Sequence, residues 1–166
     1  MPKVDKSILS NKDKIALDLN KILKSENILS HEDEVRPYET DALAAYKQKP
    51  LLVVLPETVE QVSEILKYCN ENKIKVVPRG AGTGLSGGAL PLADCVLLGM
   101  GKFNKILEID YQNKCVVLQP CVTNLAITNA VQDKKFYYAP DPSSQIACSI
   151  GGNVAENSGG VHSLKY

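Results

Sequence analysis

The chain has 166 residues, and its 19 Lys and Arg balance its 19 Asp and Glu, so the formal net charge is zero. This length fits one domain or a part of a larger protein, and the balanced charge gives no support for binding to nucleic acid or to acidic membranes. No apolar stretch approaches the roughly 18 residues of a membrane span, and the start lacks the apolar segment of a secretory signal, so a cytoplasmic location is expected.

The cysteine and histidine content argues against a metal site or a disulfide framework. The five cysteines are odd in number and no two have CxxC spacing, whereas zinc sites, iron–sulfur sites and disulfide-rich folds show such patterns. The two histidines, His31 and His162, are far apart in the sequence. The sequence therefore predicts buried, reduced thiols and no metal site.

Residues 1–33 are expected to form a helical segment ahead of the main domain. Residues 12–28 place Ile15, Leu19 and Ile22 on one face, which is typical of an amphipathic helix. Residues 31–41 are polar and contain a proline, so we expect an extended loop there, followed by a short helix over residues 42–48.

A strand–helix–strand unit begins at residue 51. The apolar run LLVVL (51–55) predicts a buried strand, and Thr58 followed by Gln61 has the spacing of a capping box at the start of a helix that ends near Asn72. The run IKVV (74–77) predicts a second strand. Because a helix joins the two strands within about 30 residues, they should form a βαβ unit with parallel strands.

The rest of the chain favours a mixed architecture. Strands are expected over 95–100, 106–110 and 115–120, and the turn-like YQNK between the last two favours an antiparallel hairpin. Thr123 is expected to cap a helix that runs to about Lys134, and the remaining residues lose regular periodicity. Parallel and antiparallel strands together place the chain in the α+β class.

Residues 78–88, PRGAGTGLSGG, follow the second strand directly. Gly82, Gly84 and Gly87 satisfy GxGxxG, but a nicotinamide dinucleotide fingerprint needs a helix that starts inside the motif, and the following Gly, Pro and apolar strand do not provide one. The phosphate-loop pattern also fails, because no Gly-Lys-Ser/Thr follows. A nest of main-chain N–H groups that binds an anion and a mobile surface loop both remain open.

A second glycine cluster lies near the end of the sequence. PDPSS (140–144) supplies a carboxylate and two hydroxyls, and SIGGNVAENSGG (149–160) adds small residues and two asparagines. A flat heteroaromatic ring could lie against such a backbone, and two distant clusters suggest a long ligand bound at both ends. Each polar residue taken alone could equally stabilise its own turn.

These two stretches resemble the two FAD-binding signatures of the vanillyl-alcohol oxidase/p-cresol methylhydroxylase (PCMH) flavoprotein superfamily. RPYETDALAAY (36–46) and LPETVEQVSEIL (55–66) make the chain similar to the FAD-linked oxidases of the glycolate oxidase and D-lactate dehydrogenase type. The resemblance implies a PCMH-type FAD-binding domain over residues 34–166, with a βαβ first subdomain, a mixed sheet and the start of a second subdomain.

The resemblance also implies a set of cofactor-binding residues. The pyrophosphate would be held by Arg79, Gly80, Ala81, Gly82, Thr83 and Gly84. The ribityl chain and isoalloxazine would lie along Asp141, Ser143, Ser144, Cys148, Gly151, Gly152, Asn153, Asn157, Ser158 and Gly159. His162 would be structural, because similar proteins bind FAD noncovalently, and Ser163 stands where the family is expected to have cysteine.

By the same resemblance, the function would be oxidation of a 2-hydroxy acid, with hydride transfer to flavin N5 and electron transfer to a partner such as the iron–sulfur subunit of glycolate oxidase. The family's substrate-binding cap domain has no counterpart in these residues, so no catalytic base is named. We expect an amino-terminal portion that is not active alone. The alternative is a non-catalytic remnant with no independent activity.

Overall fold

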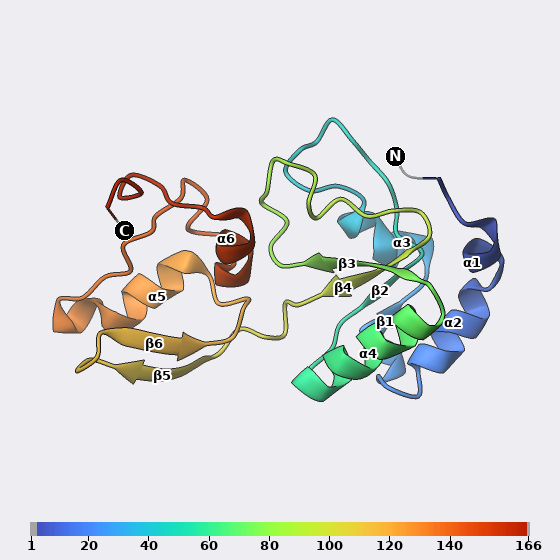
Figure 1. Ribbon diagram of the computed structural model, residues 1–166, viewed down its shortest axis with the longest axis horizontal. Helices are drawn as coiled ribbons and strands as arrows, with labels where there is room; N and C mark the ends of the chain where they lie inside the picture. The colour runs from blue at the N-terminus through green and yellow to red at the C-terminus, as the bar shows by residue number, and fades with distance from the viewer. Residues whose placement is uncertain (1–2, 166) are drawn as a thin grey trace. The chain divides into compact units, whose positions relative to one another are not determined.

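The computed structural model describes residues 3–165 of the chain and divides it into two compact units (Figure 1). The first unit ends at Lys102 and the second begins at Phe103. Each unit has its own sheet and its own apolar core. The predicted boundary between residues 33 and 34 stays a prediction.

A four-stranded mixed sheet forms the centre of the first unit. Its strands are β1 (Ile28–Leu29), β2 (Leu52–Val54), β3 (Lys75–Arg79) and β4 (Cys95–Gly99). The strand order is β1-β2-β4-β3; β4 runs parallel to both of its neighbours, and β1 is antiparallel to β2. The predicted parallel strands β2 and β3 are therefore confirmed, but β4 lies between them.

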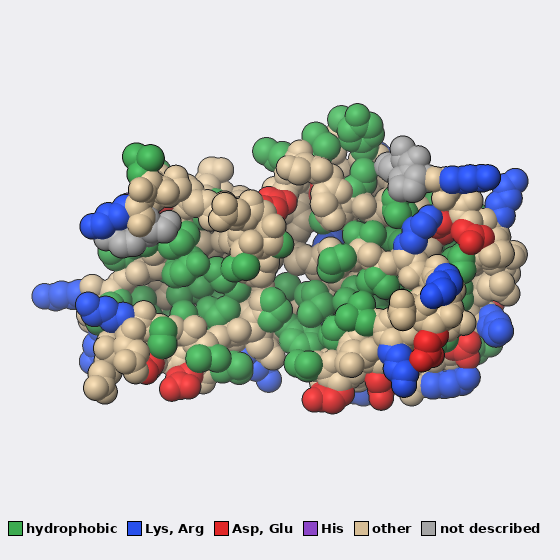
Figure 2. All heavy atoms as spheres, viewed as in Figure 1, with side chains coloured by type: hydrophobic (Ala, Val, Ile, Leu, Met, Phe, Trp, Pro, Cys, Tyr) green, Lys and Arg blue, Asp and Glu red, His purple; other side chains and the backbone are tan. Residues whose placement is uncertain are grey.

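The first unit also contains α-helices and short 3-10 helices, which precede or connect the strands. They are α1 (Lys6–Ser10), α2 (Lys12–Leu19), η1 (Ser25–Asn27), α3 (Glu32–Val35), η2 (Arg36–Tyr38) and α4 (Val59–Glu71). The core joins strand side chains such as Leu52 and Val96 to Leu19 of α2 and Ile65 of α4, all of which are fully buried. Charged side chains of both signs gather over α1 and α2 (Figure 2).

The expected capping at α4 is confirmed. The Thr58 hydroxyl accepts a hydrogen bond from the Gln61 N–H, and the Gln61 side chain accepts one from the Glu57 N–H. These bonds satisfy main-chain donors that the first turn of a helix leaves without partners. The helix ends at Glu71, next to the predicted Asn72.

Three expectations for the first unit were wrong. The helix predicted over residues 12–28 ends at Leu19, and the segment predicted as an extended loop contains α3 and η2. The Glu34 carboxylate accepts the N–H groups of Ser30 and His31 and so caps α3. Residues 42–48 form no helix; the Ala42 N–H donates to the Gly82 carbonyl and the Leu43 N–H to the Asp41 carboxylate.

The second unit pairs a hairpin with two helices. Strands β5 (Ile106–Asp110) and β6 (Cys115–Leu118) are antiparallel, as predicted, and α5 (Asn124–Val131) is followed by η3 (Gln132–Lys134). Together α5 and η3 span the helix predicted from Thr123, although the Thr123 side chain makes no capping bond. Val122, Ile127 and Ile150 form the core.

One helix in the second unit was not predicted. Helix α6 (Ile150–Glu156) lies in the tail that was expected to be irregular, and it contains Gly151 and Gly152. Glycine disfavours helix interiors, but the Ser149 hydroxyl caps this helix by accepting the Gly152 N–H, and Ile150 packs in the core. Local propensity was therefore overridden by capping and packing.

The α+β class with a mixed sheet is confirmed. In the described part of the chain, no helix has both the length and the apolar character that crossing a membrane requires.

Candidate cofactor site

The first glycine cluster begins where β3 ends, at Arg79. The described segment between Arg79 and Cys95 contains no helix, so the expectation that this loop would not form a helix-based dinucleotide fingerprint is confirmed. The loop follows the carboxyl end of a strand in a largely parallel sheet, which is where open α/β sheets bind ligands.

The loop offers main-chain donors that have no protein acceptor. Among residues 3–165, no main-chain N–H from Ala81 to Gly88 donates a hydrogen bond to another protein group. Gly82 and Gly87 have φ angles of +70° and +77°, a conformation that glycine adopts without steric cost. Successive free N–H groups of this kind form a nest suited to an anion.

The Arg79 side chain contacts Tyr38 and Thr40, which precede β2 in the chain. Its Nη1 atom donates to the carbonyl of Thr40 at 2.7 Å, and the guanidinium lies over the Tyr38 ring at 5.7 Å from its centroid. Burial lowers the pKa of Arg79, while the negative charge of Asp41 acts in the opposite direction. Gly82 packs against this side chain, because a Cβ added at Gly82 would lie 2.5 Å from the Arg79 Nη2 atom.

Asp41 is a buried carboxylate beside this loop that was not predicted as a site residue. Its side chain accepts the Leu43 N–H at 2.9 Å through Oδ1, while Oδ2 has no hydrogen-bond partner among the described residues. The only signal for Asp41 in the sequence is its place within RPYETDALAAY (36–46), which carries part of the family resemblance. A buried charged oxygen without a partner is costly, so nearby positive charge is needed to offset it.

The second unit contains a pocket formed by α6 and the segments around it. Its volume is about 480 Å³, within the range of roughly 300–1,000 Å³ that small-molecule sites occupy. It is lined by Tyr138, Pro140, Asn153, Val154, Asn157, Ser158, Gly159 and Ser163. Four of the predicted cofactor-binding residues, Asn153, Asn157, Ser158 and Gly159, therefore line one pocket.

Asn153 lines this pocket, and its buried side-chain amide is incompletely hydrogen-bonded. The residue is 6% exposed, and its Nδ2 atom has no hydrogen-bond partner among the described residues. Buried polar groups in proteins nearly always have a partner. The amide of Asn153 is therefore an exception to this rule among the described residues.

Asp141 is tied to the segment that follows α6. Its N–H donates to the Gly159 carbonyl at 2.8 Å, and its Oδ2 atom lies 3.2 Å from Nδ1 of His162. Burial acts to raise the pKa of Asp141, but the hydrogen bonds from His162 outweigh it and leave the pKa below its usual value. His162 thus has a structural partner, and its predicted lack of a flavin link stays a prediction.

The other predicted residues of the second unit do not line this pocket. The carbonyl of Ser144 accepts the N–H of Cys148, and the carbonyl of Cys148 accepts the N–H of Asn124. The Gly151 N–H donates to the Pro120 carbonyl at 2.8 Å, and the Gly152 N–H donates to the Ser149 hydroxyl that caps α6. The remaining predicted residue, Ser143, is exposed.

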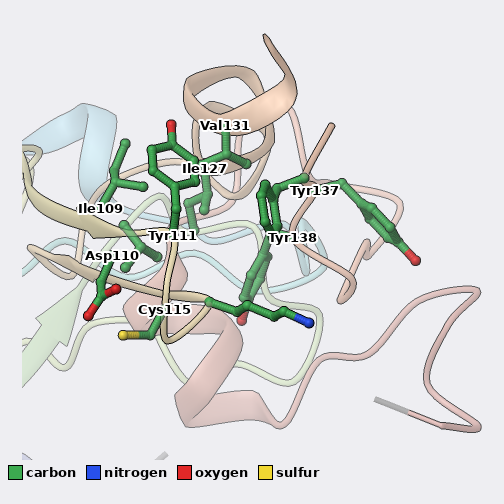
Figure 3. Close-up of a pocket in the computed structure, with 11 residues that line it drawn as sticks. Ile109, Asp110, Tyr111, Cys115, Ile127, Val131, Tyr137 and Tyr138 are labelled. Atoms are coloured by element: carbon green, nitrogen blue, oxygen red, sulfur yellow. The ribbon is translucent and has the colours of Figure 1, made fainter. Parts of the chain in front are cut away.

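A smaller pocket lies between the hairpin and α5 (Figure 3). Aromatic and aliphatic side chains such as Tyr111, Ile127 and Tyr138 surround it, and its volume is about 80 Å³, well below that of a typical ligand site. None of the predicted cofactor-binding residues lines it. Among residues with described positions, no three or more His, Cys, Asp or Glu side chains come together as metal ligands.

A family model described as an FAD binding domain matches residues 50–166. The chain belongs to this family. The match covers both glycine clusters, about half of the first unit and all of the second, and it confirms the FAD-binding domain and the PCMH-type fold that the resemblance implied.

Curated relatives of this FAD-binding domain include 2-hydroxy-acid oxidoreductases. It is 53% identical over all 166 residues to the glycolate oxidase subunit GlcD of Escherichia coli (strain K12), covering 32% of that protein. It is 39% identical to the D-lactate dehydrogenase of Anaerostipes hadrus over 81% of this chain and 28% of that protein. The chain thus spans about a third of the length of the curated relatives it matches.

Solved structures show the same fold. An alkyldihydroxyacetonephosphate synthase matches with a TM-score of 0.80 at 21% identity, over 99% of this chain and 31% of that one. A p-cresol methylhydroxylase with substrate bound matches with a TM-score of 0.66 at 28% identity, over 76% of this chain and 25% of that one.

The residues present fit an FAD. In the first unit, free main-chain N–H groups of the glycine loop suit the two negative charges of a pyrophosphate. In the second unit, the pocket lined by Asn153, Asn157 and Ser158 is large enough for a polar organic group.

Proposed function

We propose that this chain is the FAD-binding portion of a 2-hydroxy-acid oxidoreductase of the glycolate oxidase and D-lactate dehydrogenase type. The observation that carries the proposal is the 53% identity to a glycolate oxidase subunit over the whole chain. Bound FAD would supply the redox chemistry by accepting a hydride at N5 from the hydroxyl-bearing carbon of the substrate. The role of this chain is to bind and orient that cofactor.

In the first unit, the main chain from Gly80 to Gly84 would hold the pyrophosphate. Its N–H groups from Ala81 onward have no protein acceptor, and hydrogen bonds to charged groups contribute about 1.5–3 kcal/mol each. The Thr83 hydroxyl could add another donor. The glycines allow the phosphates to approach the backbone closely.

In the second unit, Asn153, Asn157, Ser158 and Gly159 would contact the cofactor directly, because they line one pocket. The other proposed residues would shape the backbone around it. Asp141 fixes the segment at Gly159 through a main-chain hydrogen bond, and Cys148 and Gly151 hold the main chain that leads into α6. Ser143 and Ser144 belong to the turn that precedes Cys148, and Gly152 lies in the first turn of α6.

The substrate, the partner and the location are parts of this proposal. The substrate would be a small 2-hydroxy acid, and the electron acceptor would be an iron–sulfur subunit, since the similar E. coli protein is named as a subunit of glycolate oxidase. The location would be the cytoplasm. We assign no catalytic base and expect no turnover from this chain alone.

Flavin titration of the purified chain tests the proposal. We expect the fluorescence of FAD to change on binding and the melting temperature to rise, since a ligand at 100 times its dissociation constant stabilises the folded state by about 2.7 kcal/mol. Riboflavin, which lacks the pyrophosphate, should bind more weakly. If saturating FAD changes neither signal, the chain has no autonomous cofactor site and the remnant alternative is favoured.

A matched pair of variants tests whether FAD binds at the proposed pocket. Asn153→Asp replaces the amide N–H donor with an acceptor oxygen of nearly the same size, and we expect it to weaken FAD binding by about tenfold, the loss of one hydrogen bond of roughly 1.4 kcal/mol. Asn70→Asp, at an exposed position of α4, is the control and should leave the affinity unchanged. Equal affinities for both variants would contradict the assignment of Asn153.

A further inference from the structure

The guanidinium of Arg79 already has protein partners on the side facing residues 38–41. Nη1 donates to the Thr40 carbonyl at 2.7 Å and lies 3.5 Å from the Tyr38 carbonyl. The Tyr38 ring lies 5.7 Å from the guanidinium carbon, within the range of a cation–π interaction. The planar guanidinium therefore bridges the end of β3 and a segment about 40 residues earlier in the chain.

The same contacts fix the start of the glycine loop. Gly82 lies so close to the Arg79 side chain that a Cβ there would be 2.5 Å from Nη2, and the Gly82 carbonyl accepts the Ala42 N–H at 3.0 Å. The Arg79 carbonyl accepts the Met100 N–H at 2.9 Å, which anchors the strand end. The first turn of the loop thus packs on the arginine side chain from one side and is bonded to Ala42 from the other.

The positive charge of Arg79 also interacts with a negative charge of the protein, that of Asp41. Asp41 is 5% exposed, and its Oδ2 atom lacks a hydrogen-bond partner among the described residues. A buried carboxylate of this kind needs a nearby cation, and the charge of Asp41 acts on Arg79. If Arg79 turned to bind a phosphate, the Thr40 carbonyl would lose its donor and the guanidinium charge would move relative to Asp41.

We propose that Arg79 is a positioning residue that fixes the first turn of the glycine loop against Tyr38–Ala42, and that the loop's main-chain N–H groups, not the guanidinium, bind the pyrophosphate. The claim about pyrophosphate binding rests on the proposed FAD function. The claim that Arg79 positions the loop concerns the protein without flavin and can be tested separately.

The first experiment measures amide hydrogen exchange by NMR on the full chain without flavin. The reporter is the Ala42 N–H, which the Gly82 carbonyl protects. We expect Arg79→Lys and Arg79→Leu to speed its exchange by about tenfold or more, because lysine cannot replace the planar fork of arginine. Arg36→Lys, at an exposed position of η2, is the matched control and should leave the rate unchanged.

The second experiment measures FAD affinity as a function of salt for the same variants. A positioning role predicts that Arg79→Lys weakens FAD binding as much as Arg79→Leu does, with the salt dependence unchanged. A direct phosphate contact predicts that Arg79→Lys keeps most of the affinity, because lysine binds phosphate as a point charge. It also predicts that Arg79→Leu reduces the salt dependence, because an ionic contact has been lost.

The two experiments separate the possible outcomes. An unchanged Ala42 exchange rate in both Arg79 variants, or FAD affinity preserved by Arg79→Lys alone, would overturn the inference. If the unmodified chain binds no FAD, the proposed function fails, whereas the Ala42 measurement still decides whether Arg79 holds the loop. A melting temperature recorded for each variant without flavin shows whether an effect reflects global unfolding instead.

Discussion

The Nζ atom of Lys75 lies 2.6 Å from Oδ2 of Asp94, a carboxylate whose side chain is 2% exposed. Lys75 is the first residue of β3, and Asp94 immediately precedes β4. The same oxygen accepts the N–H of Asp5 at 2.7 Å. This ion pair therefore ties two neighbouring strands to the start of the chain.

We predict that removing the lysine costs more stability than neutralising the aspartate. Lys75→Met leaves the buried charge of Asp94 without its cation, which should lower the free energy of unfolding by about 3 kcal/mol. Asp94→Asn keeps an acceptor for the Asp5 N–H and leaves Lys75, whose side chain is 37% exposed, free to reach water, so a loss of about 1–2 kcal/mol is expected. Urea unfolding followed by circular dichroism measures both, and the reverse order would contradict the argument.

The stability should fall at acidic pH, partly through Asp94. Burial acts to raise the pKa of Asp94, but the hydrogen bonds from Lys75 and Asp5 outweigh it, so the pKa lies below its ordinary value of 3.8. A lowered pKa in the folded state contributes stability that is complete above the unfolded value and is lost as the pH falls through the folded value. Unfolding free energies should therefore be flat from about pH 7 to 5 and decline below about pH 4. Asp94→Asn should reduce this acid dependence; an unchanged slope would exclude Asp94 as a contributor.

The hydroxyl of Thr58 should stabilise α4 as an N-cap. It accepts the Gln61 N–H at 3.3 Å, and replacing such a cap by alanine costs about 1 kcal/mol. We expect Thr58→Ala to lower the urea midpoint accordingly. Ser63→Ala, at an exposed position of the same helix, is the control and should be neutral or slightly stabilising. Equal effects at both positions would contradict a capping role.

Gly151 should not tolerate a side chain. An added Cβ would lie 2.8 Å from the Cβ and 3.0 Å from the carbonyl oxygen of Pro120, so Gly151→Ala should cost about 1–3 kcal/mol through overpacking, even though alanine favours helices. Gly101→Ala is the comparison, because an added Cβ there meets nothing within 4 Å. Thermal unfolding measures the difference, and a stabilised Gly151→Ala protein would show that α6 can shift away from Pro120.

The cysteines should react with thiol reagents in a defined order. Burial raises the pKa of Cys69 and of Cys95 to about 11 each, so at pH 8 only about 0.1% of either thiol is ionised and reactive. Cys115 is exposed on β6 and should be modified first. Mass spectrometry after brief alkylation of the native protein identifies the site. Cys115→Ser should remove the fast phase, and rapid labelling of Cys69 would indicate local opening of the first core.

The strands were predictable because their signals are local. Apolar runs bounded by turn residues marked β2, β3 and β4, and the Thr58–Gln61 spacing marked the start of α4. The hairpin of β5 and β6 followed from two largely apolar runs joined by the turn-like YQNK. In each case the residues that define the element are neighbours in the sequence, so no knowledge of distant contacts was needed.

The errors occurred where distant or unusual partners decide the local structure. The segment that contains α3 was predicted to be extended, although Glu34 caps that helix through main-chain N–H groups. Helix α6 holds two glycines and was predicted to be irregular, yet the Ser149 cap and the packing of Ile150 stabilise it. Residues 42–48 have helix-favouring alanines but form no helix, and the Ala42 N–H bonds to the distant Gly82 carbonyl.

By itself, the sequence determined the glycine-rich loop after β3, the second glycine cluster and the family to which both belong, because missing side chains and their spacing are visible in one dimension. Only the tertiary structure decided that Arg79 bonds to Thr40, 39 residues away, and that Asn153, Asn157 and Ser158 line one pocket. The physical reason is that a hydrogen bond or a pocket depends on which distant groups folding brings together, and burial then decides which polar atoms keep a partner.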